Sequence, residues 1–88
     1  MKVSFLSRFS KDLDAITDPT VKADIKATIE QVKTAPNQKA ILNLKKLQGY
    51  KTAYRIRTGN YRIGVFIEKG TVEFARVVDR KDIYKVFP

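Results

Sequence analysis

The chain contains neither cysteine nor histidine, and these two absences exclude much of the catalytic chemistry open to a small protein. Without cysteine there is no disulfide framework and no thiolate metal site. Without histidine, zinc-dependent hydrolysis, a serine–histidine nucleophile pair and a histidine-based ribonuclease are excluded as well. Any catalysis must therefore rely on other side chains, and we expect neither a metal nor a cofactor.

Long apolar segments are also missing. No run approaches the ~20 apolar residues that cross a bilayer, and no charged-then-apolar leader opens the chain. We therefore expect a cytoplasmic protein that does not associate with membranes. Its 88 residues suffice for one domain, residues 1–88, with a modest core and little stability to spare.

Positive charge is concentrated in the second half of the chain. The sequence has 18 lysines and arginines against 9 acidic residues, a net charge of +9. Residues 1–44 contribute +2 of this charge and residues 45–88 contribute +7. A basic half of this kind attracts polyanions through counterion release, without sequence selectivity. Nucleic acid is the favoured partner, although the same field would attract an acidic protein.

Residues 54–63 predict a β-hairpin that brings arginines face to face. The Gly-Asn pair at 59–60 separates two runs of β-branched and aromatic residues and is typical of a two-residue turn. This turn pairs Arg57 with Arg62 and places both on one face with Arg55. Like charges directly opposite each other destabilise a sheet, so the pattern favours a bound anion, and planar guanidinium groups suit phosphate. The alternative is that these arginines only keep the surface soluble.

A second reversal, at residues 69–70, predicts a further antiparallel strand over residues 71–78. Counting from this turn pairs Gly64 with Ala75, so that two small residues form a shallow floor on the arginine face. The same register leaves Arg76 on the apolar face, which a β-bulge nearby would resolve.

The N-terminal half predicts a short strand and two amphipathic helices. Residues 3–6 are apolar and extended in character, and Ser7 is expected to cap the first helix. Asp18 followed by Pro19 is a strong start signal for the second helix. Segment 38–52 is compatible with either a short helix or an extended lead-in to the hairpin.

Together these elements predict an α+β fold with an N-terminal strand, a two-helix hairpin packed on one face of a small, mainly antiparallel sheet, and a short C-terminal tail. The opposite face carries the basic groove. Additional RNA contacts are expected from flanking basic and aromatic residues, namely Lys45, Lys46, Lys51, Phe66 and Lys81. The alternative is that the lysines are merely solvated and that the tail covers Phe66.

Three segments of the chain resemble the RelE branch of the RelE/ParE toxin superfamily: Lys46–Gly49, Tyr54–Ile63 and Val77–Tyr84. The resemblance covers essentially the whole chain. It implies a toxin that cleaves messenger RNA in the ribosomal decoding site, by attack of a 2′-hydroxyl on the adjacent phosphate. It also implies a toxin–antitoxin hetero-oligomer, in which we expect an acidic, partly disordered antitoxin.

The same resemblance implies five catalytic residues. Arg55 and Arg57 take the two basic strand positions, and Arg62 clamps the phosphate. Arg80 stabilises or protonates the leaving group, and Tyr84 orients a base or stacks on it. Because an arginine is a poor general base, catalysis would depend on positioning and charge stabilisation.

Two other functions fit the same residues. A ParE-like toxin would use the scaffold to inhibit DNA gyrase by binding, and a non-catalytic RNA- or antitoxin-binding remnant is a further alternative. The spacing of Arg80 and Tyr84 favours the RelE interpretation, whereas the poor basicity of Arg57 keeps the gyrase alternative open. Asp79 adds to the ambiguity, because its carboxylate could either hold Arg80 in place or repel the phosphate.

Overall fold

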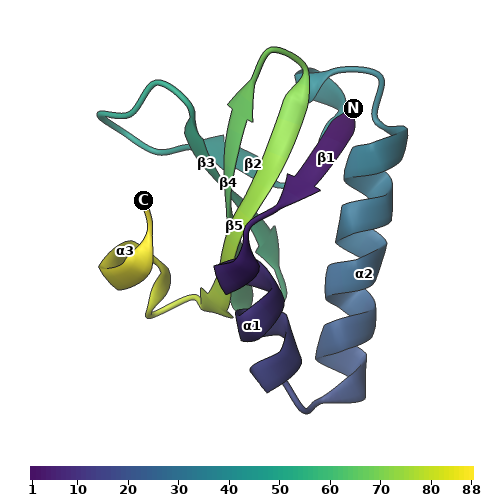
Figure 1. Ribbon diagram of the computed structural model, residues 1–88, viewed down its shortest axis with the longest axis vertical. Coiled ribbons are helices and arrows are strands. Elements are labelled where there is room, and N and C mark those ends of the chain that lie inside the picture. Colours follow the sequence, from purple (N-terminus) through teal and green to yellow (C-terminus); the bar gives the residue numbers. More distant parts are fainter.

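The computed structural model describes residues 1–88 and contains a five-stranded sheet with helices on both faces (Figure 1). The strands, in the spatial order β1-β5-β4-β3-β2, are β1 (Lys2–Phe5), β2 (Leu44–Lys46), β3 (Ala53–Thr58), β4 (Tyr61–Glu68) and β5 (Thr71–Asp79). The helices are α1 (Ser7–Ala15), α2 (Pro19–Thr34), the 3₁₀ turn η1 (Gln38–Ala40) and α3 (Ile83–Val86). Only β1 pairs in parallel, with β5, so the predicted mainly antiparallel α+β fold is confirmed.

Helix α2 begins where the sequence predicts. The Asp18 carboxylate accepts hydrogen bonds from the N–H groups of Thr20 and Val21, at 2.9 and 3.4 Å, and Pro19 occupies the first helical position. The buried residues of this helix recur with helical spacing and are Ile25, Ile29 and Val32. Neither this helix nor any other has the length and apolarity needed to span a membrane.

The predicted cap of α1 is wrong. Ser7 is the first helical residue and the N-cap is Leu6, which makes no side-chain capping bond. The Leu6 N–H donates to the Phe74 carbonyl at 2.9 Å, so the pairing of β1 with β5 keeps Leu6 extended up to the start of the helix. The strand therefore runs directly into the helix, and no residue is left between them for a capping serine.

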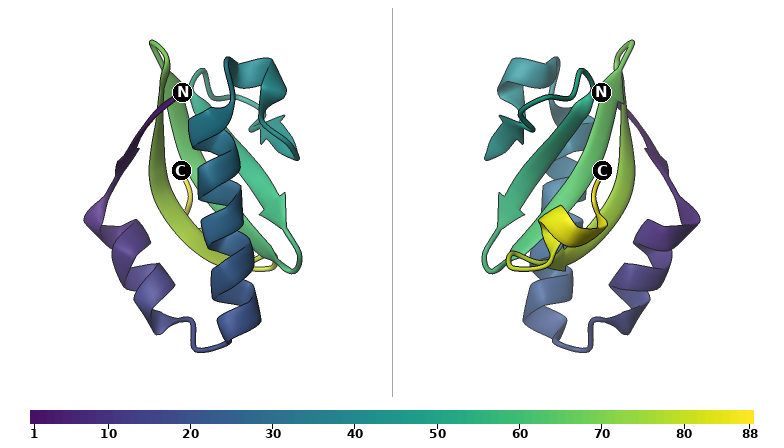
Figure 2. Two further views of the ribbon diagram at one scale, coloured as in Figure 1. Left: turned by 90° about the vertical axis from the view of Figure 1, so that its right-hand side faces the viewer. Right: turned by 90° about the vertical axis from the view of Figure 1, so that its left-hand side faces the viewer.

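The two long helices and the short one lie on opposite faces of the sheet (Figure 2). On the face covered by α1 and α2, Phe9 packs edge-on against Phe74, with ring centroids 5.4 Å apart. The sheet contributes alternate residues to this core, including Ile56, Ile63, Val65, Val72, Phe74 and Val77. The hairpin arginines, Arg55, Arg57 and Arg62, lie on the other face, as predicted.

A β-bulge corrects the predicted register of β4 and β5. Val65 lies opposite Phe74 as expected, but Gly64 lies opposite Arg76 and not opposite Ala75. The register shifts by one residue between Gly64 and Val65, which leaves Ala75 without a partner. Because of this extra residue, the remainder of β5 is displaced by one position relative to β4.

The bulge also explains Arg76, whose position the regular register left unexplained. Strand β1 ends opposite Phe74, so the following part of β5 has no neighbouring strand on that side. Asp12 of α1 fills this place: its Oδ2 accepts from Arg76 Nε at 2.7 Å and from the Val77 N–H at 3.1 Å, while its Oδ1 accepts from Arg76 Nη2 at 3.1 Å. This hydrogen bond to Asp12 raises the pKa of Arg76, so the ion pair remains charged.

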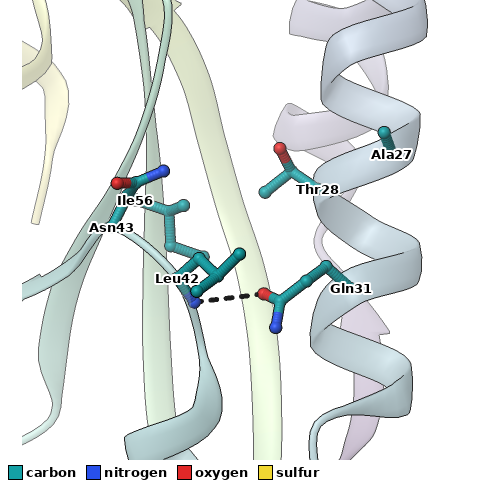
Figure 3. A pocket seen from close by; sticks show the side chains of 6 residues that line it. All are labelled: Ala27, Thr28, Gln31, Leu42, Asn43 and Ile56. Atoms are coloured by element: carbon teal, nitrogen blue, oxygen red, sulfur yellow. Dashed lines mark hydrogen bonds between the residues drawn. The ribbon is translucent and has the colours of Figure 1, made fainter.

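The ambiguous segment 38–52 adopts the extended alternative, with only the single turn η1 before β2. Gln31 of α2 fixes this segment, since its Nε2 donates to the Ala40 carbonyl at 2.8 Å. Its Oε1 accepts from the Leu42 N–H at 3.1 Å, which is the bond drawn in Figure 3. The adjoining hollow of about 180 Å³ is lined by Ala27, Thr28, Gln31, Leu42, Asn43 and Ile56, none of them charged. The polar contacts of this hollow are structural, because the Gln31 amide uses both its donor and its acceptor to hold the neighbouring segment.

We expect Asp12→Ala to destabilise the fold, because it leaves the Arg76 guanidinium and the Val77 N–H without their acceptor. Both side chains of the ion pair are only 16% exposed, and removing one partner of such a pair lowers the free energy of unfolding by about 2–4 kcal/mol. Urea unfolding measures this loss. Asp14→Ala is the matched control, since Asp14 is an exposed residue of the same helix and gains the same helix propensity. Equal stabilities of the two variants would contradict the role of Asp12.

Candidate nucleic-acid interface

The hairpin of β3 and β4 places arginines against one another in the predicted register. Arg57 lies opposite Arg62, and Arg55 lies opposite Gly64. Within the turn only Gly59 has a positive φ, of 57°, which corresponds to a turn of the II′ kind that holds the two strands in this alignment. We refer to Arg55, Arg57, Arg62 and Arg80 as the arginine patch.

Arg62 folds back onto the hairpin turn. Its Nη1 donates to the carbonyl oxygens of Gly59 and Tyr61, each at 3.0 Å. These bonds satisfy part of the guanidinium and leave its remaining N–H groups available. The side chain is thus held near the end of the hairpin, on the partly exposed arginine face.

The structure brings together the five residues expected to be catalytic. Partial desolvation lowers the pKa of Arg62 most, and the positive charges of Arg55, Arg57 and Arg80 lower it further. Tyr84 acts in the opposite direction and raises this pKa. All four side chains therefore lie within electrostatic range of Arg62. No ion pair neutralises any arginine of the patch, since the salt bridges of the molecule lie elsewhere.

The end of β5 is fastened to the hairpin turn, and this contact positions Arg80. The Arg80 N–H donates to the Asn60 carbonyl at 2.8 Å. Asp79 does not pair with the Arg80 side chain; its Oδ1 accepts from the Lys81 N–H at 3.0 Å and so closes the turn after β5. Arg80 remains exposed and free of a carboxylate partner.

The C-terminal tail packs on the floor of the arginine face. Phe87 is buried, and its ring atoms lie 2.6–2.8 Å from where a Cβ on Gly64 would stand. Ala75 belongs to the same small apolar cluster, so the predicted floor of small residues exists and receives Phe87. The Phe66 ring lies 5.0 Å from that of Phe87, which supports the alternative that the tail covers Phe66. Phe87 thus anchors the C-terminal tail to the sheet.

Lys45 extends the arginine patch onto β2. It lies directly opposite Arg55 in the antiparallel pair of β2 and β3, and it is exposed. The two residues share a hollow of about 290 Å³ whose lining is completed by Asn43, Leu44 and Arg57. This hollow carries three positive charges and no acidic group, so it suits an anion.

The structure does not gather the other lysines around this hollow. Lys46 lies opposite Tyr54 and lines a different hollow, of about 470 Å³, with Ile41 and Leu44. Lys51 is exposed in the loop between β2 and β3, and Lys81 is exposed directly after Arg80. Their contacts with RNA stay predictions.

Sequence reasoning missed Gln48 and Tyr50. They flank Gly49, whose φ of +87° produces the turn between β2 and β3. With the C-terminal tail they line a hollow of about 350 Å³. A tyrosine in a turn belongs to no periodic pattern, so only the fold brings it near Tyr84.

A model of the "ParE toxin of type II toxin-antitoxin system, parDE" family matches residues 3–84. The chain belongs to the RelE/ParE toxin superfamily. It is 42% identical to Toxin RelE3 of Methanocaldococcus jannaschii over 89 residues, which span the full length of both chains.

Two solved structures place this type II toxin close to RelE proteins. The RelB–RelE antitoxin–toxin complex of Methanococcus jannaschii superposes with a TM-score of 0.80 and 39% identity, over 97% of this chain and 99% of the other. The intact Escherichia coli RelBE toxin–antitoxin complex gives a TM-score of 0.67 and 26% identity, over 89% and 94% of the two chains. The family resemblance seen in the residues is thereby confirmed.

Gly64→Ala should displace the tail of this toxin, because the new Cβ would stand only 2.6–2.8 Å from three atoms of the Phe87 ring. Overpacking of this kind lowers the free energy of unfolding by about 1–3 kcal/mol. Urea unfolding measures the loss.

A double-mutant cycle supplies the control for this prediction. In the Phe87→Ala background the ring is absent, so Gly64→Ala should cost markedly less than in the parent toxin. An equal cost in both backgrounds would show that the glycine is needed for another reason, such as its own backbone conformation.

Proposed function

We propose that this RelE-family toxin is a ribosome-dependent endoribonuclease that cleaves messenger RNA. The observation that carries the proposal is the arginine patch: the guanidinium groups of Arg55, Arg57 and Arg80 converge with Tyr84 around Arg62, and no arginine of the patch forms an ion pair. Repulsion among these groups is relieved when a phosphate binds between them. Because the phosphodiester gains charge in the transition state, the patch would stabilise that state more than the ground state.

The proposed reaction is an internal transesterification. The 2′-oxygen of one ribose attacks the adjacent phosphorus, and the new P–O2′ bond forms as the P–O5′ bond breaks. The 2′-hydroxyl loses its proton to water, and the departing 5′-oxygen takes one from water. The products are a 2′,3′-cyclic phosphate and a 5′-hydroxyl end, and no oxidant, metal or cofactor is required.

The arrangement of the side chains supports a division of roles. Arg62, released from the carbonyl groups of the turn, would clamp the non-bridging oxygens together with Arg57. Arg80, held at the end of β5, would donate a hydrogen bond to the leaving oxygen while water supplies its proton, and Arg55 would add positive charge from the same face of β3. Tyr84 is 66% exposed and presents a ring on which a base can stack.

No group in the patch is suited to act as a base near neutral pH. An arginine remains protonated in proteins, and the lowered pKa of Arg62 does not change this. The proposal therefore assigns catalysis to positioning and charge stabilisation, with the ribosome holding the RNA in line for attack.

Arg62→Ala and Arg80→Ala should each reduce the single-turnover rate of cleavage at least ~100-fold on programmed ribosomes with saturating toxin. Both variants should fold, because neither side chain belongs to the apolar core. Arg8→Ala is the matched control, since Arg8 is an exposed arginine on α1, away from the patch, and its variant should cleave at the parent rate. If Arg62→Ala and Arg80→Ala also cleave at the parent rate, the patch is only a binding surface.

Gyrase inhibition is the second candidate, because the matching family model is that of the ParE toxins. Mapping RNA ends in cells after brief induction separates the two functions. Cuts inside translated frames that disappear when translation is blocked support the ribonuclease. Intact messages together with DNA damage and trapped gyrase complexes would assign the toxin to the ParE class.

We also propose that an acidic antitoxin segment covers or distorts the arginine patch. Two relatives were crystallised as toxin–antitoxin complexes with RelB, and the second half of this chain carries a net charge of +7. A partly disordered acidic segment can wrap a small domain of this charge and fold on binding.

The association rate of this antitoxin should fall steeply with added salt, because the positive charges of the patch attract its acidic segment over a distance that salt screens. Stopped-flow mixing at several salt concentrations measures this dependence. Arg57→Ala should flatten it more than Lys26→Ala, which removes an exposed charge from α2. Association that ignores salt, or binding that leaves the toxin active, would contradict this partner.

A further inference from the structure

The hollow between the C-terminal tail and the loop joining β2 to β3 has the composition of a base-binding site. Its volume is about 350 Å³, and its lining comprises Leu47, Gln48, Tyr50, Tyr84, Phe87 and Pro88. Leu47 and Phe87 are buried and form an apolar floor, whereas Tyr50 and Tyr84 are 51% and 66% exposed. No charged side chain lines the hollow, although the protein is strongly basic.

Three groups of this hollow have no partner within the protein. The rings of Tyr50 and Tyr84 stack on no other aromatic ring of the chain. The Gln48 amide is exposed, and no hydrogen bond of the protein uses it. An amide with free donor and acceptor beside two exposed rings can recognise a flat molecule that presents both hydrogen-bonding edges and π-faces.

The hollow is linked to the arginine patch through Phe87 and Gly64. Phe87, which forms part of the floor, packs on Gly64, and Gly64 lies directly opposite Arg55 in the sheet. The loop between β2 and β3 and the segment around α3 project on the same side of the sheet, away from α1 and α2 (Figure 1). A strand of RNA with a phosphate on the patch would therefore have a neighbouring nucleotide at the hollow.

We propose that this hollow binds an unpaired nucleobase of the RNA strand, between Tyr50 and Tyr84, with the Gln48 amide reading the edge of the base. The proposal rests on the proposed function, in that the strand bound at the patch is RNA. It assigns base preference to the loop between β2 and β3, which contributes no residue to the arginine patch. Stacking on aromatic rings accepts every base, so selectivity would come from the hydrogen bonds of Gln48.

Equilibrium binding of short RNA to the full chain tests this site without requiring cleavage. The probes are single-stranded tetranucleotides whose 2′-hydroxyls are replaced by fluorine, together with a matched series in which one position at a time lacks its base. Fluorescence anisotropy gives the affinity of each probe. Tyr50→Ala should weaken binding of the complete RNA by about 5- to 100-fold, the range expected for the loss of one stacking contact, and Tyr50→Phe should retain most of the affinity.

The abasic series tests whether the loss of affinity in Tyr50→Ala comes from a base bound in the hollow. At one position, the loss of the base should remove the difference in affinity between Tyr50→Ala and the parent, because the Tyr50 ring then has no base to stack on. At that same position Gln48→Ala should change the relative affinities of the four bases, whereas Arg8→Ala should change none of them. Failure of the parent to bind, or an equal effect of Tyr50→Ala on complete and abasic RNA, would overturn the proposal.

This test separates the hollow from the proposed reaction. If cells show no cleavage of messenger RNA on the ribosome, but the affinity measurements still couple Tyr50 to one base, the ribonuclease function fails and the base site stands. If cleavage occurs while no position couples to Tyr50 or Gln48, the base site falls and the ribonuclease function stands.

Discussion

The repulsion between Arg57 and Arg62 is the interaction around which the rest of this toxin is organised. Two guanidinium groups directly opposite each other in an antiparallel pair oppose the pairing by an energy on the order of 1 kcal/mol. The adjacent pair, Ile56 with Ile63, is almost completely buried on the helix side and stabilises the same hairpin. The core thus holds together charges that would separate in a less rigid structure, and the field is in place before any ligand arrives.

The two faces of the sheet are linked through its small residues. Gly64 and Ala75 leave room on the arginine face for Phe87, while their neighbours Val65 and Phe74 fill the core on the opposite face. The bulge makes this arrangement possible, because it adds one residue to β5 without altering the side of the sheet that Phe74 faces. The position of the tail, and with it Tyr84, therefore depends on the register of β5 against β4, which also brings Arg80 to the hairpin turn.

Much of the site could be predicted from the sequence, because it depends on local rules. The Gly-Asn turn and the two-residue period of a strand suffice to place Arg55, Arg57 and Arg62 on one face. Likewise, Asp18 and Pro19 mark a helix start that requires no tertiary information.

The features that could not be predicted depend on contacts between distant segments. The sequence indicates a bulge near Arg76, but it does not indicate that Asp12, more than 50 residues away, takes the place of a missing strand beside this bulge. Leu6 became the cap of α1 because it hydrogen-bonds to Phe74 on β5. Tyr50 gave no signal at all, since its proximity to Tyr84 exists only once the tail has packed on the sheet.

The order of the strands has a consequence for the synthesis of the chain. β1 is made first but occupies the edge of the sheet next to β5, which is made last among the strands. Contacts between segments so far apart in sequence form late in folding, because a long loop must close first. The nascent polypeptide cannot complete its sheet, or bring Arg80 and the tail to the hairpin, until these final segments have emerged from the translating ribosome. A protein whose proposed target is that same machine would therefore acquire its complete basic face only late in its own production.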